Sequence, residues 1–532
     1  MGVRHRVSTW IVAAAVAGIG LAACGGASRS AQSSAGTAAV SFAGCPTTGA
    51  AAGTASASGT GSWPYPNGTI ANTRDVPGST ITSSNVSTLR ERWTFKLTGE
   101  AAADISETGS LASNPIVRDG VVYLQDLHSN VYALSLGTGK LLWECRLDRT
   151  ITSGPGPNGV AVADGLVFGQ TPTTTFALNA RTGRKVWANS ALLRPGQGTF
   201  GIQPAVADGR VYLASQVGNA SGGGVLLGLQ ASNGRQLWKF KTYAGASRAV
   251  PGGGAWDTPL AGSGGSVTFG TGNPYRSTAV AIAHPSRQLY TDSDVDLDGA
   301  SGRLRWYFQG VTDDFKDYDM QTSPIATRIG ATPVMIGSGK MGIVYAIDAD
   351  NGRLLWKTPV GEHNGHDDDS LDALEHRSAL KAPYTILPGS FGGVESDLAV
   401  AGDAVYVATC NLPFTVKSMT APLGTPTMSL ARATGDLEAL NLETGKVEWD
   451  TRLNGLPLGA ATVSQNLVFT TLYPGILLAL DRSTGAIVER LKLPTSTNSP
   501  IAIAGNTVLV PAGGATAQTP GGDPQLVAYS PG

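Results

Sequence analysis

Five residues between positions 256 and 340 have side chains and spacings that could do chemistry. Asp317 and Asp319 are one residue apart, so an extended chain puts both carboxylates on one face, where their repulsion is costly unless a cation lies between them. Lys340 offers a positive charge that can stabilise negative charge as it develops. Asn273 offers an amide oxygen, which suits a hard cation, and Trp256 offers a flat aromatic face. These residue types suit a metal ion beside a planar group, provided the fold brings them together.

A second group of potential metal ligands consists of His363, His366 and the run from Asp367 to Asp369. It lies in a long stretch that interrupts a repeat, and a polar solvated loop explains it better than a metal cluster. The segment GSGKMG around Lys340 lacks the spacing of a phosphate-binding loop. No G-x-S-x-G and no C-x-x-C-H pattern occurs, so neither a nucleophile elbow nor covalently attached c-type haem is predicted.

The composition favours an all-β chain. Of 532 residues 14% are charged and 70 are glycine, which suits short strands joined by tight turns and excludes coiled coil and charge-rich disorder. The 38 basic and 39 acidic residues nearly balance, so there is no basic field of the kind that nucleic acid requires.

The N-terminal residues predict export and attachment to a membrane. A basic start and an apolar run too short to span a bilayer predict a signal peptide over residues 1–23. The run ends in LAACG, which resembles the lipobox of bacterial lipoproteins, so Cys24 is the predicted lipidation site; secretion with a chance cysteine is the alternative. Residues 24–62, rich in Gly, Ala, Ser and Thr, are predicted to form a flexible tether from the membrane surface to a body at 63–532. Cys45, Cys145 and Cys410 remain, and an odd number leaves at least one unpaired, with no pairing assignable.

An internal repeat decides the predicted fold. A short strand pattern, a glycine turn and a tryptophan four residues later recur, as in VYALSLGTGKLLW. The repeated tryptophans are Trp143, Trp187, Trp238, Trp306, Trp356 and Trp449. A seventh copy has Glu489 in place of tryptophan. Each copy follows another pair of strand signals, often with an Asp-Gly hairpin turn, so every unit has four strands, as propeller blades do.

The ends of the chain complete the predicted ring. The C-terminal stretch supplies an eighth set of strands without its tryptophan strand, and RERWTFKL around Trp93 supplies the missing one. We therefore predict an eight-bladed β-propeller closed by its N- and C-terminal strands, without an open edge. The tryptophans are predicted to dock neighbouring blades and to bind no ligand. The long interval between Trp356 and Trp449 predicts an insertion of about 45 residues where a site could be built.

The repeat A-x-D-x-x-T-G-x-x-x-W resembles that of the quinoprotein alcohol dehydrogenases, eight-bladed propellers that hold pyrroloquinoline quinone. Assembly lipoproteins without a quinone share the repeat, so other residues have to discriminate. GGGAWDTP followed by VTFGTGNPYR is similar to the family's G-G-x-x-W and G-T-G-N-P signature. The resemblance implies that Trp256 lies under the quinone and that the Asn273 side-chain oxygen ligates the metal.

Two further segments extend the resemblance. WYFQGVTDDFKDYDMQTSP is similar to the family stretch ending in W-D-Y-D or W-D-Y-A, which implies that Asp317 is the catalytic base and a metal ligand. Asp319 matches the additional carboxylate of members that use a lanthanide instead of Ca²⁺. Lys340 stands where the family has an Arg or Lys that hydrogen-bonds the reactive quinone oxygen. The alternatives without a catalytic role are a turn beside a core tryptophan, for Asn273 and Trp256, and a solvated acidic loop, for Asp317 and Asp319.

Three departures from the family pattern stand beside these matches. The adjacent Cys-Cys pair of many members is missing, and Lys316 replaces the tryptophan before the catalytic aspartate. The glutamate of the metal site should precede Gly222, where the chain has Asn219 and Ser221 and no acid.

The sequence predicts a membrane-anchored, extracytoplasmic dehydrogenase that oxidises a small-molecule or polymeric alcohol with pyrroloquinoline quinone and Ca²⁺ or a lanthanide. Electrons would pass to an external cytochrome or membrane quinone, because the chain carries no haem motif. The alternatives are a cofactor-free propeller that binds a protein or an envelope polymer, and a hydrolase or sugar-binding propeller.

Overall fold

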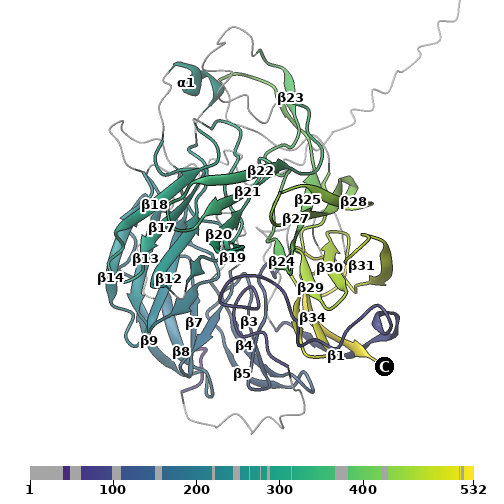
Figure 1. Cartoon of the computed structure of the whole chain (residues 1–532). Coiled ribbons are helices and arrows are strands. Elements are labelled where there is room, and N and C mark those ends of the chain that lie inside the picture. Colours follow the sequence, from purple (N-terminus) through teal and green to yellow (C-terminus); the bar gives the residue numbers. More distant parts are fainter. Residues whose placement is uncertain are drawn as a thin grey trace, which may run out of the picture.

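The structure is a computed structural model, and it describes residues 40–47, 61–98, 109–149, 158–217, 222–243, 252–262, 264–275, 277–283, 288–312, 314–365, 381–420, 429–514, 516 and 521–532. The signal peptide, Cys24 and most of the predicted tether lie outside these ranges. In the described part of the chain the strands form eight blades around a ring (Figure 1). The predicted eight-bladed, all-β propeller is confirmed.

The first four blades follow one another along the chain. Blade 1 contains β2 (Ile116–Arg118), β3 (Val121–Gln125), β4 (Val131–Ser135) and β5 (Leu141–Cys145). Blade 2 contains β6 (Ala161–Ala163), β7 (Leu166–Gln170), β8 (Thr175–Asn179) and β9 (Lys185–Asn189). Blade 3 contains β11 (Ala205–Ala207), β12 (Arg210–Gln216), β13 (Val225–Gln230) and β14 (Gln236–Lys241), with the short β10 (Thr199–Phe200) also paired to β12. Blade 4 contains β15 (Leu260–Ala261), β16 (Ser266–Gly270), β17 (Ser293–Asp298) and β18 (Leu304–Gln309).

The other four blades complete the circle. Blade 5 contains β19 (Ile325–Ile329), β20 (Thr332–Gly337), β21 (Ile343–Asp348) and β22 (Leu354–Pro359). Blade 6 contains β24 (Ala399–Ala401), β25 (Ala404–Asn411), β27 (Thr434–Asn441) and β28 (Val447–Leu453). Blade 7 contains β29 (Thr462–Ser464), β30 (Leu467–Leu472), β31 (Ile476–Asp481) and β32 (Ile487–Lys492). Blade 8 contains β33 (Ala502–Ala504), β34 (Thr507–Ala512), β35 (Gln525–Pro531) and the N-terminal β1 (Leu89–Lys96), which follows the 3₁₀ turn η1 (Val86–Thr88).

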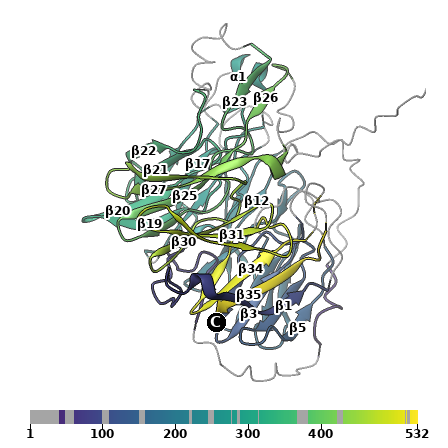
Figure 2. The same ribbon diagram turned by 90° about the vertical axis from the view of Figure 1, so that its right-hand side faces the viewer.

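Blade 8 is closed by the two ends of the chain, as predicted. β1 pairs antiparallel with β35, and Trp93 stands opposite Ala528 in the register. The purple β1 lies beside the yellow C-terminal strands in both views (Figures 1 and 2). The pairing leaves no exposed edge at the point where an open sheet would be most prone to association.

The predicted Asp-Gly hairpins form at the expected places. Asp119 and Gly120 turn between β2 and β3 with φ of 51° and 74°, and Asp208 and Gly209 turn between β11 and β12 with φ of 50° and 68°. Positive φ at both central residues is the condition of the type I′ turn, and aspartate followed by glycine meets it at low cost.

The repeated tryptophans dock each blade onto the next. The indole Nε1 of seven tryptophans, Trp93 included, donates to a main-chain carbonyl of the following blade at 2.8 to 3.1 Å. Each ring lies against the turn glycine of that blade, where an added Cβ would approach it to between 2.4 and 2.8 Å. Glu489 takes the eighth position, and the reason is topological. Its neighbour is blade 8, whose last two strands come from opposite ends of the chain and have no connecting glycine turn.

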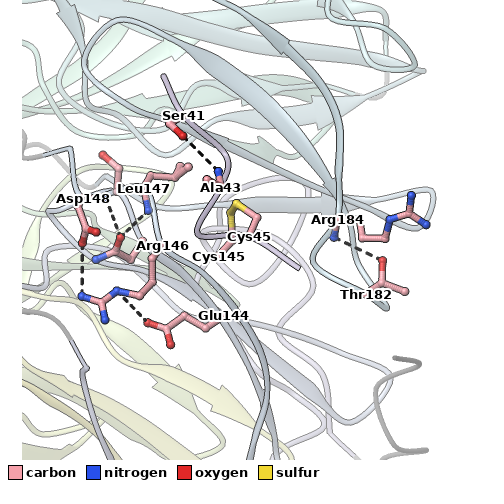
Figure 3. Close-up of a disulfide and its surroundings, with 12 residues drawn as sticks. Ser41, Ala43, Cys45, Glu144, Cys145, Arg146, Leu147, Asp148, Thr182 and Arg184 are labelled. Carbon is pink, nitrogen blue, oxygen red and sulfur yellow. Dashed lines mark hydrogen bonds and ion pairs between the residues drawn. A yellow bond between two sulfur atoms is a disulfide. The ribbon is translucent and has the colours of Figure 1, made fainter. Parts of the chain in front are cut away.

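The middle of the predicted tether differs from expectation, because residues 40–47 pack on the propeller. A disulfide joins Cys45 to Cys145 at the end of β5, and the Arg146 N–H donates to the Gly44 carbonyl at 3.0 Å (Figure 3). Phe42 packs edge-on against Phe176 of blade 2, with ring centroids 5.6 Å apart. Among the described cysteines Cys410 has no disulfide partner, and it is buried.

Three insertions project together from one side of the ring (Figures 1 and 2). One carries the short helix α1 (Thr278–Ala283) in blade 4. The second connects blade 5 to blade 6 and carries β23 (Tyr384–Ile386). The third lies between β25 and β27 of blade 6 and carries β26 (Phe414–Val416), which pairs with β23, and η3 (Leu430–Arg432). The first and third insertions touch where the Ala279 N–H donates to the Met419 carbonyl at 2.8 Å. None of the described helices has the length and apolar character that a membrane-crossing helix needs.

Candidate active site

Two loops of blade 4 place Trp256 and Asn273 next to each other. The glycine-rich loop before β15 runs beside the loop that follows β16: the Gly253 N–H donates to the Asn273 carbonyl at 3.0 Å, and the Gly272 N–H donates to the Gly254 carbonyl at 2.6 Å. Gly253 has φ of 68°, and a Cβ on Gly252 would lie 2.2 Å from the Asn273 carbonyl oxygen. The glycines are therefore required for the two loops to approach so closely.

Gly272 is the point where the signature motif meets the acidic segment. A Cβ at this position would lie 2.4 Å from Asp319 Oδ1 and 2.6 Å from Trp256 Nε1. The next residue, Asn273, donates its main-chain N–H to Asp319 Oδ1 at 2.7 Å. The G-T-G-N-P motif thus brings the tryptophan, the asparagine and one carboxylate to one place.

The segment that carries Asp317 and Asp319 is a buried turn. The Asp314 carboxylate accepts the N–H groups of Lys316 and Tyr318 at 2.9 and 2.8 Å, and Tyr318 donates its hydroxyl to the Pro388 carbonyl at 2.6 Å. Asp317 has φ of 69°, a left-handed conformation that is uncommon outside glycine and is often found at functional sites. Asp317 is 5% exposed and Asp319 is fully buried, so the alternative of a solvated acidic loop is wrong.

Lys340, in the loop between β20 and β21, lies between the two carboxylates. Its Nζ is 3.1 Å from Asp317 Oδ2 and 2.6 Å from Asp319 Oδ2, and its main-chain N–H donates to the Asp319 carbonyl. The ammonium also lies over the ring of Phe391, 5.8 Å from the centroid. With only 7% of Lys340 exposed, the three charges form an ion triad away from bulk solvent.

The charges of the triad do not balance, and this sets its proton affinities. Burial would lower the pKa of Lys340, but Asp317 and Asp319 outweigh it and hold that pKa well above its usual range. Burial raises the pKa of Asp317 well above its usual range, and the neighbouring Asp319 adds to the effect against the ammonium. One ammonium cannot neutralise two carboxylates, so Asp317 takes up a proton more readily than an exposed aspartate does.

The oxygen donors present fit a hard metal ion. Asn273 Oδ1 is buried without a hydrogen-bond partner, although a buried amide oxygen is normally satisfied. It belongs to the residue whose main-chain N–H contacts Asp319, and amide and carboxylate oxygens are the donors that Ca²⁺ and its trivalent analogues prefer. Asn219 and Ser221, which stand where the family has a glutamate, lie outside the described residues.

Three buried acids near the site were not predicted. Asp314 shapes the turn. Asp292 is fully buried before β17, and burial followed by the charges of Asp314 and Asp319 raises its pKa well above the usual range. Glu395 in the long insertion accepts a hydrogen bond from Gln321 at 2.7 Å, and burial raises its pKa to about 7. The three acids lie in three separate segments of the chain. Only Asp314 has a local sequence signal, the Asp-x-Lys-x-Tyr spacing of a turn.

His363, from the second group of potential metal ligands, contacts main-chain carbonyl groups instead of the site acids. His363 Nε2 lies 3.1 and 3.0 Å from the carbonyl oxygens of Gly342 and Val360, and His366 and the aspartates after it lie outside the described residues. Within the described ranges, three acids on β27 and β28 have ligand atoms all within 4.8 Å of one another. They are Asp436, Glu438 and Asp450.

Family models place the chain among known propellers. The model described as "Glucose/ethanol/alcohol dehydrogenase, beta-propeller domain" matches residues 63–159 and 194–364, half of the chain, and the second range contains all five predicted site residues. The chain belongs to the quinoprotein alcohol dehydrogenase family. A model described as "Outer membrane protein assembly factor BamB" matches residues 127–253 and 433–530, which contain none of the five.

Individual relatives agree with this membership. The chain is 26% identical over 478 residues to the quinoprotein alcohol dehydrogenase PedH of Pseudomonas putida, covering 77% of this chain and 78% of that protein. It is 27% identical over 386 residues to a quinohemoprotein alcohol dehydrogenase of Comamonas testosteroni, but spans only 52% of that protein and 64% of this chain. A europium-containing methanol dehydrogenase structure has the same fold, with a TM-score of 0.72, 18% identity and coverage of 89% of this chain and 98% of that one.

Proposed function

We propose that this member of the quinoprotein family is an exported, lipid-anchored dehydrogenase that oxidises an alcohol by hydride transfer to pyrroloquinoline quinone. The observation that carries the proposal is the buried ion triad next to the unpartnered Asn273 oxygen and Trp256. A blade-docking repeat requires none of these groups, and a binding scaffold gains nothing from burying two carboxylates on one ammonium.

When bound, the quinone supplies the electrophilic carbonyl that accepts the hydride, and a metal ion on it acts as a Lewis acid. Asn273, Asp317 and Asp319 would hold Ca²⁺ or a lanthanide through oxygen, and Trp256 would support the planar ring system. The additional carboxylate of Asp319 favours the trivalent ion, because it adds negative charge to a site that Lys340 alone does not neutralise.

Asp317 is the proposed base that takes the hydroxyl proton of the alcohol. Its pKa is raised above that of an exposed carboxyl group, so Asp317 is a stronger base than an exposed aspartate. Lys340 would stabilise the negative charge that develops on the reduced oxygen, since its ammonium is already fixed among buried groups and needs no reorganisation.

The partners follow from the same chemistry. The substrate is a small-molecule or polymeric alcohol, and the electrons leave to an external acceptor, a cytochrome or a membrane quinone. Lipidation at Cys24 would hold the propeller at the outer surface of a membrane. The alternative function, a cofactor-free scaffold that binds a protein or an envelope polymer, has support from the assembly-factor model, which matches blades outside the five site residues.

Reconstitution separates the two functions. The detergent-extracted full chain is incubated with pyrroloquinoline quinone and either Ca²⁺ or La³⁺, and bound-quinone absorbance and dye-linked alcohol oxidation are measured. The dehydrogenase should bind quinone with at least one metal and reduce the dye. Absence of quinone binding with both metals contradicts the proposal and favours the scaffold.

The base is tested by Asp317→Asn. This variant should keep bound quinone and lose turnover by at least a thousandfold, because an amide cannot accept the hydroxyl proton; measurable turnover near that of the parent would remove Asp317 from the role. Asp350→Asn in an exposed turn is the matched control and should behave as the parent does.

A further inference from the structure

Two aspartates of blade 4 break the repeat at positions that are otherwise apolar or small. Asp296 stands opposite Trp306 in the register, where the other six copies of the repeat have alanine or glycine. Asp294, two residues earlier, stands where those copies have Val, Leu or Thr. Neither residue is needed for blade docking, and each places a carboxyl group in an interior face of the propeller.

Asp294 is deeply buried and incompletely partnered. It is 1% exposed, and its Oδ2 has no hydrogen-bond partner among the described residues. It faces blade 5, where a Cβ on Gly337 would lie 2.3 Å from this oxygen and 3.5 Å from Met320 Cε. Met320 directly follows Asp319, so Asp294 lies beside the segment that carries the ion triad.

Asp296 links this interior position to the surface. Thr268 of β16 donates to its Oδ1 at 2.8 Å, and Arg305 Nη1 of β18 lies 2.9 Å from its Oδ2. The carboxylate is 2% exposed, whereas the Arg305 side chain is 40% exposed. Asp296 therefore stands at the boundary between the dry interior and water.

Asp292, immediately before β17, lies between Asp294 and the active site; its φ of 48° places it outside the alternation of the strand, which holds for Asp294 and Asp296. The Asp292 N–H donates to the carbonyl of Gly272, the glycine that separates Asp319 from Trp256. Alternate residues of a strand are about 6.8 Å apart along one face. One water molecule between neighbouring carboxyl groups spans such a gap, and a carboxyl group can both accept and donate a proton.

We propose that Asp294 and Asp296 form a proton path from the active site, beginning beside Asp292 and ending in solvent at Arg305. The proposal rests on the proposed function. Oxidation of an alcohol to a carbonyl compound removes two electrons and two protons. Once both electrons have passed to the external acceptor, both protons must leave a site whose acid and base groups are buried.

The proton affinities along β17 fall towards the surface. Burial alone raises the pKa of Asp294 to about 8. Burial also raises the pKa of Asp296, but Thr268 and Arg305 act against it and hold it at about 6. Transfer from Asp294 to Asp296 is therefore unfavourable by itself, and it is completed because Asp296 releases its proton to water at neutral pH. The charged groups that act on the path are Asp314, Asp317 and Asp319 at Asp292, and Arg305 at Asp296.

Turnover tests the path if the chain is an active dehydrogenase. In Asp294→Asn and Asp296→Asn, kcat should fall at least tenfold with little change in KM or in quinone binding, and formate or azide should restore it by carrying protons through the gap. Glu438→Gln is the matched control, a buried acid on the third strand of blade 6. Unchanged kcat and pH profile in both variants, or a loss that small acids do not restore, overturns the path.

Infrared spectroscopy gives a second readout that needs no cofactor or turnover. The carbonyl-stretch band of the protonated Asp294 carboxyl should disappear in Asp294→Asn, and in the parent it should shift within seconds of transfer to D₂O. In Asp296→Asn the same shift should slow at least tenfold. An Asp294 band that exchanges equally fast with and without Asp296 refutes the path, even if the protein proves to have no dehydrogenase activity.

Discussion

Replacement of Lys340 by methionine tests whether the ammonium stands in for a metal ion in the ion triad. Lys340→Met keeps most of the side-chain volume and removes the charge that lies 3.1 and 2.6 Å from the two carboxylates. At an effective dielectric constant of about 20 those contacts correspond to roughly 5 and 6 kcal/mol of Coulomb attraction. Desolvation of the ammonium offsets much of this, and removal of one partner from a buried ion pair typically costs about 3–5 kcal/mol.

The cost should depend on pH with a definite sign. In the variant both carboxylates lose their counter-charge, so the folded-state pKa of Asp317 rises further above its value in the unfolded chain. The folded state then binds more protons than the unfolded state, and its stability falls as pH rises. We expect the deficit of about 3–5 kcal/mol at pH 8 to shrink towards pH 5, where protonation relieves the repulsion.

The assay is denaturant unfolding followed by tryptophan fluorescence, with EDTA and with La³⁺. La³⁺ should stabilise the variant more than the parent, because no ammonium competes for the carboxylates; binding at a hundred times Kd adds about 2.7 kcal/mol. Lys446→Met, at an exposed position, is the control. Equal unfolding midpoints for parent and Lys340→Met at pH 8, with equal responses to La³⁺, would refute this view of the triad.

Two further predictions concern the glycine at the site and the disulfide. Gly272→Ala should abolish quinone and La³⁺ binding while leaving the circular dichroism spectrum intact. The reason is that the added Cβ would lie 2.4 Å from Asp319 Oδ1 and 2.6 Å from Trp256 Nε1. Retained binding would contradict this prediction and show that the loops can separate. Cys45→Ser removes a disulfide across 100 residues and should lower the free energy of unfolding by up to about 4.7 kcal/mol, measured by denaturant titration. Cys410→Ser is the control, because it leaves the disulfide intact. Equal stability of the two variants would contradict this prediction.

The architecture could be predicted because its signals are local. Each glycine turn lies four residues before its tryptophan, and each Asp-Gly pair joins two strands, so a stretch of about a dozen residues specifies one hairpin. Repetition then sets the number of blades, and Trp93 supplies the strand that the C-terminus lacks. The tryptophan missing at Glu489 is explained only by the structure, since the closing blade has no covalent turn for an indole to contact.

The candidate site was predictable only in part. Trp256, Asn273, Asp317, Asp319 and Lys340 lie in motifs, and the structure brings these segments together. Asp292 and Glu395 belong to segments with no motif, and their approach to the triad depends on how the loops of blades 4 and 5 and the long insertion converge. A single carboxylate in a sequence carries no sign of such a neighbour.

The blade count, the closure of the ring and the residue types available for chemistry follow from the amino-acid sequence, because repeated short-range patterns specify turns, strands and docking contacts. Which charges are buried together depends on the folded arrangement of distant segments. The tertiary structure paired Cys45 with Cys145, placed Lys340 between two aspartates and left Asn273 Oδ1 without a partner. Burial and electrostatic coupling depend on distances between segments that the chain order does not contain, and these distances set the proton affinities on which the proposed chemistry depends.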